Sequence, residues 1–248
     1  MTPRELLRSC NYDGAILAFQ SRIALNGEDR ESISGLATAL ISARRYADAL
    51  PLLEQLSNRE RALQVGMPGR GVEIATIQWI LGLRAEAMQI ARDLTRGILD
   101  GTILYADGAG GVTQGTLLYY MAASIGDLAT VEYALSYLKT LASKPRIQQW
   151  PGPIAQFLIR KVTLFDLLKE GTGTSELAMA ISKASRDLLT RRRLCNILFA
   201  DGVVHRSNGD EALCIQRMKE CEKLTNPLLE MDWFLARDEV DREASPME

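Results

Sequence analysis

Few residues of this chain have the types and spacing that chemistry needs. His205 is the only histidine, so a multi-histidine metal site is excluded and one candidate histidine base remains. It follows Val203 and Val204 in a predicted helix, where a structural or surface role is the commoner case. Cys214 and Cys221 are seven residues apart, which is the spacing of one helix face rather than of a zinc-binding pair. The sequence therefore predicts no metal and no cofactor, and it favours a protein that is not an enzyme.

A glycine-rich segment is the candidate site for an anion. Residues 107–113 read Asp-Gly-Ala-Gly-Gly-Val-Thr and precede a predicted helix, whose first amides can bind anions. No lysine follows as in a phosphate-binding loop, and no buried strand comes before it. An ordinary loop is the commoner interpretation. An enzyme or nucleotide-dependent sensor that uses Gly108–Gly111 is therefore the least favoured function.

The basic residues do not indicate a nucleic acid partner. Arg191–Arg193 form a triplet that suits a phosphate, but a solvated helix face or a cluster of ion pairs is the commoner explanation. The net charge of the chain is -2, and no basic region with interleaved aromatic residues is present. We therefore expect no binding to nucleic acid.

Composition and the amino-terminal residues favour a cytoplasmic protein. Residues 1–11 carry charges where a secretory signal needs an apolar core, and no apolar run approaches the length of a membrane span. The four cysteines are scattered, which fits free thiols better than a disulfide framework. We expect a reducing compartment and no contact with a membrane.

Apolar and small residues between Ser32 and Leu56 follow the spacing of two helices joined by a turn. They fall on one helical face before the turn and again after it. Related patterns recur along the chain, which predicts a series of helical hairpins. The turns are expected near Cys10, Arg44, Gly82, Gly126, Gly171 and Gly209.

The clearest hairpin resembles a known repeat. An aromatic residue, Tyr46, opens its second helix and a small residue, Ala49, follows; Tyr12 and Ala15 repeat this pair. The segment resembles the tetratricopeptide repeat, whose period of about 34 residues matches the first interval between turns. Pro51 departs from the pattern, because a proline inside a helix is expected to kink or delay it.

The resemblance implies an all-α fold of stacked antiparallel helical hairpins, a TPR-like α-solenoid that forms a single elongated domain over residues 1–248. Better-matched repeats cover 1–142, and degenerate repeats with a C-terminal capping helix cover 153–242. The capping helix is expected over 226–237, where Asn226 and Pro227 give a helix start.

In such a stack the first helix of each hairpin lines an inner groove, and the two long loops 100–111 and 144–153 are further places for a partner. Aromatic side chains dominate interface energetics, although burial in the core is their commoner fate. The candidate partner-binding residues are Thr76, Trp79, Thr116 and Tyr120 in the groove, and Tyr105, Asp107 and Trp150 in the loops.

A second resemblance concerns function. The helical hairpins and the glycine-rich break, together with Trp150–Pro153, Cys195–Phe199 and Asn226–Trp233, look like the cytoplasmic helical-repeat immunity proteins of bacterial polymorphic toxin systems. This implies a non-catalytic inhibitor that binds a cognate toxin domain and blocks its active site or its substrate access. A general adaptor or co-chaperone is the alternative. It would be supported by lysines and asparagines along the groove, where threonines and aromatic residues are found instead.

Overall fold

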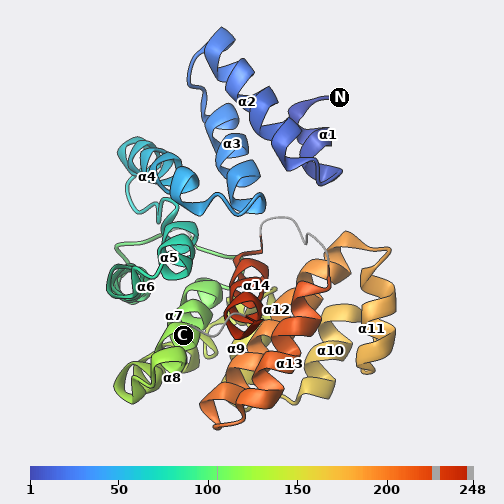
Figure 1. Cartoon of the computed structure of the whole chain (residues 1–248). Coiled ribbons are helices and arrows are strands. Elements are labelled where there is room, and N and C mark those ends of the chain that lie inside the picture. Colours follow the sequence, from blue (N-terminus) through green and yellow to red (C-terminus); the bar gives the residue numbers. More distant parts are fainter. Residues whose placement is uncertain (105, 225–229, 245–248) are drawn as a thin grey trace. The chain divides into compact units, whose positions relative to one another are not determined.

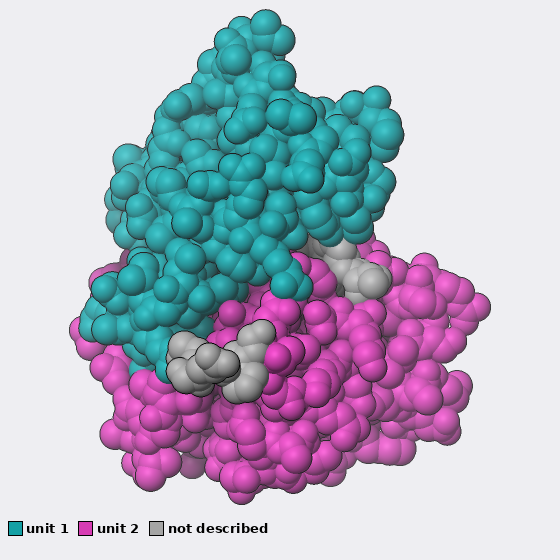
Figure 2. Space-filling view, in the orientation of Figure 1, with its two compact units in different colours: residues 1–90 teal, residues 91–248 magenta. Residues whose placement is uncertain are grey.

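The computed structural model describes residues 1–104, 106–224 and 230–244. Within these residues the regular elements are all helices and no strand is present, so the predicted all-α class is confirmed. None of these helices is both long and apolar enough to cross a lipid bilayer. Contacts divide the chain into two compact units, Met1–Ile90 and Ala91–Glu248, which are coloured teal and magenta in Figure 2.

In the first unit, each helix packs against its neighbours in the sequence. The contacts run from α1 to α2, from α2 to α3, from α3 to α4 and from α4 to α5, and α1 also touches α3. A sixth helix, α6 (Arg84–Leu99), begins in this unit and continues into the second. The first five helices are α1 (Pro3–Arg8), α2 (Tyr12–Asn26), α3 (Arg30–Ser42), α4 (Tyr46–Leu63) and α5 (Gly71–Ile80) (Figure 1).

The second unit is gathered around α12, which packs against α7, α9, α10, α11, α13 and α14. Because α7 and α12 are far apart in the sequence, long-range contacts hold this unit together as well as local ones. Its elements are α7 (Val112–Ile125), α8 (Leu128–Leu141), the 3-10 helix η1 (Pro145–Gln148), α9 (Gly152–Leu158), α10 (Leu164–Thr172), α11 (Leu177–Ala184), α12 (Leu188–Ser207), α13 (Glu211–Glu222) and α14 (Met231–Ala244).

One turn geometry recurs along the described chain. At each such turn the helix ends on a residue with positive φ, and the next amide reaches back five residues to a carbonyl at 2.8 to 3.0 Å. This is the Schellman arrangement, which satisfies the last carbonyls of a helix. The residues with positive φ are Cys10, Arg44, Gly82, Gly126, Arg160 and Gly209.

The residue after the turn often starts the next helix. Asn11, Asp127 and Asp210 each follow a turn residue directly, and each side chain accepts a hydrogen bond from an amide in the first turn of the new helix. Except after Arg160, where Phe165 is exposed, a small or medium side chain is buried five residues beyond the turn, as the sequence predicted for Ala15 and Ala49. These residues are Ala15, Ala49, Ala87, Val131 and Cys214.

Some expectations about the architecture differ from the structure. The contacts divide the chain within α6, and the single elongated domain predicted over 1–248 stays a prediction. A simple stack has contacts between neighbouring hairpins, so the packing of α12 on α7 is the main difference. The last helix was expected to cap the stack. It packs on α12 and α13, and residues 233–237 are all buried; Asn226 and Pro227 lie outside the described residues.

One local prediction was wrong for a physical reason. Gly171 was expected at a turn but lies inside α10, and Gly173, with φ +75°, ends that helix. A Cβ at Gly171 would lie 2.7 Å from Cδ1 of Ile197, so this glycine allows close approach between helices. Pro51 was expected to kink or delay its helix; α4 begins at Tyr46, ahead of the proline, and continues through it, and the kink stays a prediction.

The thiols divide by burial. Cys195, Cys214 and Cys221 are buried and Cys10 is exposed. The Sγ atoms of Cys195 and Cys221 lie 3.4 Å apart where α12 meets α13. Burial raises the pKa of Cys195 well above its usual value and that of Cys214 to about 12. Because the thiolate is the reactive form, burial and raised pKa both protect these groups.

We therefore expect one fast-reacting thiol in the native protein and four in urea, measured with a chromogenic disulfide reagent. Cys10→Ser is expected to remove the fast phase and to leave three thiols that react in urea. Fast reaction of a second thiol in the native protein would show that the α12–α13 interface is open in solution.

Candidate functional site

The four predicted groove residues are buried, so their expected exposure was wrong. Thr76 and Tyr120 have 0% of their surface exposed, Trp79 has 2% and Thr116 has 4%. The reason lies in α5 and α7, which carry apolar residues on every face and are therefore covered on all sides. Each side chain serves packing or a buried hydrogen bond rather than a free surface.

Two of the three predicted loop residues, Asp107 and Trp150, meet in one pocket. The third, Tyr105, lies outside the described residues. The pocket has a volume of about 310 Å³ and belongs entirely to the second unit. We call it the Trp150 pocket; it is lined by Asp107, Gly108, Thr113, Trp150, Pro151, Leu189, Arg192, Arg193, Asn196 and Glu230. It brings together the glycine-rich loop, the Trp-Pro-Gly-Pro segment, the arginine triplet and the start of the last helix.

Asp107 organises the glycine-rich loop. Its carboxylate accepts hydrogen bonds from the amides of Ala109, Gly111 and Thr113 at 3.0, 2.8 and 2.6 Å. Its carbonyl accepts a further bond from the amide of Gly110 at 2.9 Å. The amides that a bound anion would need are thus occupied by the protein's own carboxylate. This arrangement speaks against the nucleotide-binding alternative for Gly108–Gly111.

Trp150 is held in place by both sides of the pocket. Its indole Nε1 donates a hydrogen bond to Oδ1 of Asn196 on α12 at 3.1 Å. The glycine-rich loop lies against its carbonyl oxygen, which would be 2.9 Å from a Cβ at Gly108. Trp150 is partly exposed, unlike Trp79 and Tyr120.

The three arginines of the triplet have different surroundings. Arg191 donates to the carbonyls of Ala184 and Ser185 and so fastens α12 to the end of α11. Arg192 forms an ion pair with Glu230 at 2.5 Å. The guanidinium of Arg193 lies over the Trp150 ring, 5.3 Å from the centroid of the ring.

Arg193 lacks a polar partner in the described part of the chain. Its Nε is buried without a hydrogen-bond acceptor, and no carboxylate there lies within ion-pair distance. A buried donor without an acceptor is costly, so this group marks where a ligand could supply one.

Asn196 links the pocket to two carboxylates. Its amide nitrogen donates to Glu230 at 3.0 Å and to Asp232 at 2.7 Å. Burial, and then the nearby charge of Glu230, raise the pKa of Asp232 to about 7, although the Asn196 hydrogen bond opposes this. A carboxyl group that changes charge near neutral pH therefore lies behind the pocket.

The raised pKa of Asp232 predicts that the stability of the protein depends on pH. Because this pKa is higher in the folded state than in the unfolded state, the folded protein binds more protons, and stability falls as pH rises from about 4 to about 7. Asp232→Asn is expected to reduce the difference between the unfolding free energies at pH 5 and pH 8 by at least about 1 kcal/mol. Urea denaturation at pH 5 and at pH 8 measures the two unfolding free energies.

The matched control is Asp166→Asn. Hydrogen bonds from Thr163 lower the pKa of Asp166, so this carboxylate is ionised at both pH values and its loss should leave the difference unchanged. If Asp232→Asn left the difference between the unfolding free energies at pH 5 and pH 8 unaltered, the raised pKa of Asp232 would be contradicted.

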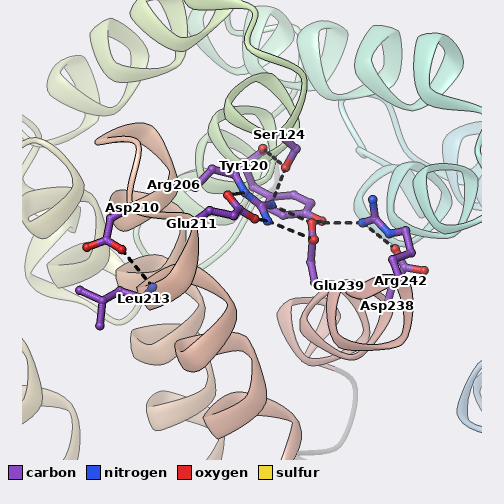
Figure 3. A network of polar contacts seen from close by, with 9 residues as sticks. All are labelled: Tyr120, Ser124, Arg206, Asp210, Glu211, Leu213, Asp238, Glu239 and Arg242. Atoms are coloured by element: carbon purple, nitrogen blue, oxygen red, sulfur yellow. Dashed lines mark hydrogen bonds and ion pairs between the residues drawn. The ribbon is translucent and has the colours of Figure 1, made fainter. Parts of the chain in front are cut away.

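A second polar cluster fastens α14 to the rest of its unit, as Figure 3 shows. Glu239 accepts hydrogen bonds from the Tyr120 hydroxyl at 2.6 Å and from Arg206 at 2.8 and 3.1 Å. Arg242 lies 3.1 Å from the same carboxylate, and Arg206 also pairs with Glu211. Side chains from α7, α12 and α14 thus meet on the Glu239 carboxylate, and α13 joins the cluster through the pair between Glu211 and Arg206.

The charges in this cluster stabilise one another. Burial raises the pKa of Glu239, but the Arg206 and Arg242 guanidinium groups outweigh it and hold that pKa below its usual value. Burial and the Glu239 charge raise the pKa of Tyr120 well above 10. Because each charged or polar side chain in this cluster already has a partner, we assign the cluster a structural role rather than a binding role. A groove of about 770 Å³ runs beside it along α13 and α14.

The candidate histidine base lies apart from the Trp150 pocket. His205 is near the end of α12, with ring nitrogens 3.7 Å from Asp201 and 3.9 Å from Asp210. Asp201 is itself paired with Arg217 at 2.6 Å. Among the described residues, no group of three or more histidine, cysteine, aspartate or glutamate side chains is placed to hold a metal ion.

Apart from Asp107 and Trp150, the residues that line the pocket were not among the predicted partner-binding residues. Arg193 was included only in a basic triplet, and Asn196 and Glu230 only in segments of the resemblance. Asn196 did carry a signal, because it is a single polar residue inside the apolar run from Leu194 to Phe199. A polar side chain in such a run needs a buried partner, which here is the indole of Trp150.

Comparison with known proteins does not identify a family. No protein-family model, no curated protein and no solved structure matches this chain. The site must therefore be interpreted from its own geometry.

Proposed function

We propose that this protein is a non-catalytic protein-binding module, and more specifically an immunity protein that binds and neutralises a cognate toxin domain. The observation that carries the proposal is the Trp150 pocket, where a partly exposed tryptophan, an arginine with no ion pair to a described residue and an exposed leucine lie together. Tryptophan and arginine are the residues most enriched where binding energy concentrates in protein interfaces.

The helical hairpins support the same proposal. Successive hairpins with one turn geometry are the building units of helical-repeat proteins, which use long surfaces to bind other proteins. In a TPR-like stack such a surface would extend beyond the pocket and give the area that a stable complex needs.

Affinity co-purification of the tagged protein from its native host, with mass spectrometry and gel filtration, tests the proposal. We expect one partner at one-to-one stoichiometry that is toxic when expressed alone. Many substoichiometric partners would favour an adaptor or co-chaperone, and no retained protein would contradict the proposal.

A pair of surface variants tests the role of the pocket. Leu189 lines the pocket and Leu128 on α8 does not, and their side chains are 55% and 74% exposed. Exposed leucines tolerate a polar replacement, so both variants should fold. We expect Leu189→Asp to abolish capture of the partner and Leu128→Asp to preserve it; equal capture would place the interface elsewhere.

A further inference from the structure

We propose that the Trp150 pocket binds the carboxylate of an acidic side chain, an aspartate or glutamate of the partner, with Arg193 as its ligand. This inference deepens the proposed function and relies on it for the protein that carries the acid. It rests on which charges in the pocket are already paired and which are free.

Among the charges that line the pocket, Arg193 is the cation without a polar partner in the described part of the chain. Arg192 is paired with Glu230, and the carboxylate of Asp107 is satisfied by the loop amides. Arg193 has neither an ion pair nor a hydrogen bond within the described residues, and its Nε is buried without an acceptor. An incoming carboxylate would give this guanidinium a charge-assisted and geometrically matched partner.

Other classes of ligand fit less well. A cationic ligand would compete with groups already in place, because loop amides bind Asp107, Arg192 pairs with Glu230 and Arg193 lies over the Trp150 ring. A phosphate group carries more negative charge, and the carboxylates of Asp107 and Glu230 line the same pocket and would repel it more strongly. The loop amides that usually bind phosphate are occupied.

The shape of the pocket suits an amino-acid side chain. Its volume of about 310 Å³ is larger than one carboxylate, and Leu189 and Pro151 supply apolar surface beside the polar groups. The methylene groups of an acidic side chain can lie on that surface. Trp150 cannot easily turn away, because its Nε1 is bound to Asn196.

An NMR titration of the full-length protein tests the inference. The probe is an acetylated and amidated peptide rich in glutamate, and the control is the same peptide with glutamine. The chain has three tryptophans, and Trp150→Phe assigns the indole signal of Trp150. We expect saturable shifts of that signal with the glutamate peptide and none with the glutamine peptide.

A matched pair of arginine variants separates specific binding from general attraction. We expect Arg193→Gln to weaken binding of the glutamate peptide at least about tenfold, because charge-assisted hydrogen bonds are the strong ones. Arg186→Gln removes the same charge from an exposed arginine that does not line the pocket, and it should leave the affinity unchanged. Equal weakening by both variants would overturn the inference.

The remaining outcomes distinguish this inference from the proposed function. The inference fails if inorganic phosphate shifts the Trp150 signal and the peptide does not, or if a captured toxin binds Arg193→Gln as tightly as the natural protein. The second result would leave the proposed function intact. Specific peptide binding without any captured protein would support the carboxylate site and contradict the proposed function.

Discussion

Replacing Glu239 with alanine is expected to lower the free energy of unfolding by about 3–5 kcal/mol, the cost of removing one partner from a buried ion pair. The substitution leaves Arg206, whose side chain is only 10% exposed, without the carboxylate that meets it at 2.8 Å. It also removes the acceptor of the buried Tyr120 hydroxyl. Urea denaturation followed by circular dichroism measures the effect.

Two further variants make this test specific. Glu243→Ala removes a neighbouring carboxylate whose ion pair with Lys219 is exposed, so it should cost less than about 1 kcal/mol. Tyr120→Phe removes one hydroxyl and is expected to cost about 1–2 kcal/mol. If Glu239→Ala and Glu243→Ala were equally mild, the cluster would not fasten α14 as the structure indicates.

Gly152→Ala is expected to have the second large effect, a loss of about 3 kcal/mol or more, because large losses come from overpacking a site that cannot relax. A Cβ at this position would lie 1.8 Å from the carbonyl oxygen of Ile147, which is backbone and cannot turn aside. Since Gly152 directly follows Trp150-Pro151, the movement that relieves this clash should also disturb the Trp150 pocket.

Thermal unfolding and the indole signal of Trp150 check both parts of this expectation. Gly101→Ala is the control, since a Cβ there meets nothing within 4 Å and only the positive φ of +71° opposes it. That strain costs roughly 1–2 kcal/mol and should leave the Trp150 signal in place. A Gly152→Ala protein as stable as the control would contradict the close approach of Ile147.

Local features of the fold could be predicted from the sequence because they depend on neighbouring residues. The turns at Gly82, Gly126 and Gly209 are marked by glycine, which adopts positive φ without strain. Arg160 makes the same turn and was missed, since nothing in an arginine signals a left-handed backbone. Gly171 was predicted in place of Gly173, because two glycines so close together cannot be separated by pattern alone.

The binding residues were harder to predict because they depend on contacts between distant segments. Asp107 and Trp150 were chosen for their loops, and the structure brings them into one pocket. The groove residues were placed by analogy with a repeat, but α5 and α7 have no polar face to turn outward. Arg193 becomes a candidate binding residue only because it lies over the Trp150 ring. The sequence around residue 193 gives no sign of this contact.

The spacing of Tyr120 and Glu239 has a consequence for synthesis on the ribosome. A hairpin such as α3 and α4 has both its helices within a few tens of residues, so it can close soon after it emerges. The hydroxyl of Tyr120, in contrast, can bind its acceptor only after Glu239, 119 residues later, has been synthesised. The second unit can therefore complete its core only when α14 has been made, and a nascent chain stopped before α14 should remain a substrate for chaperones.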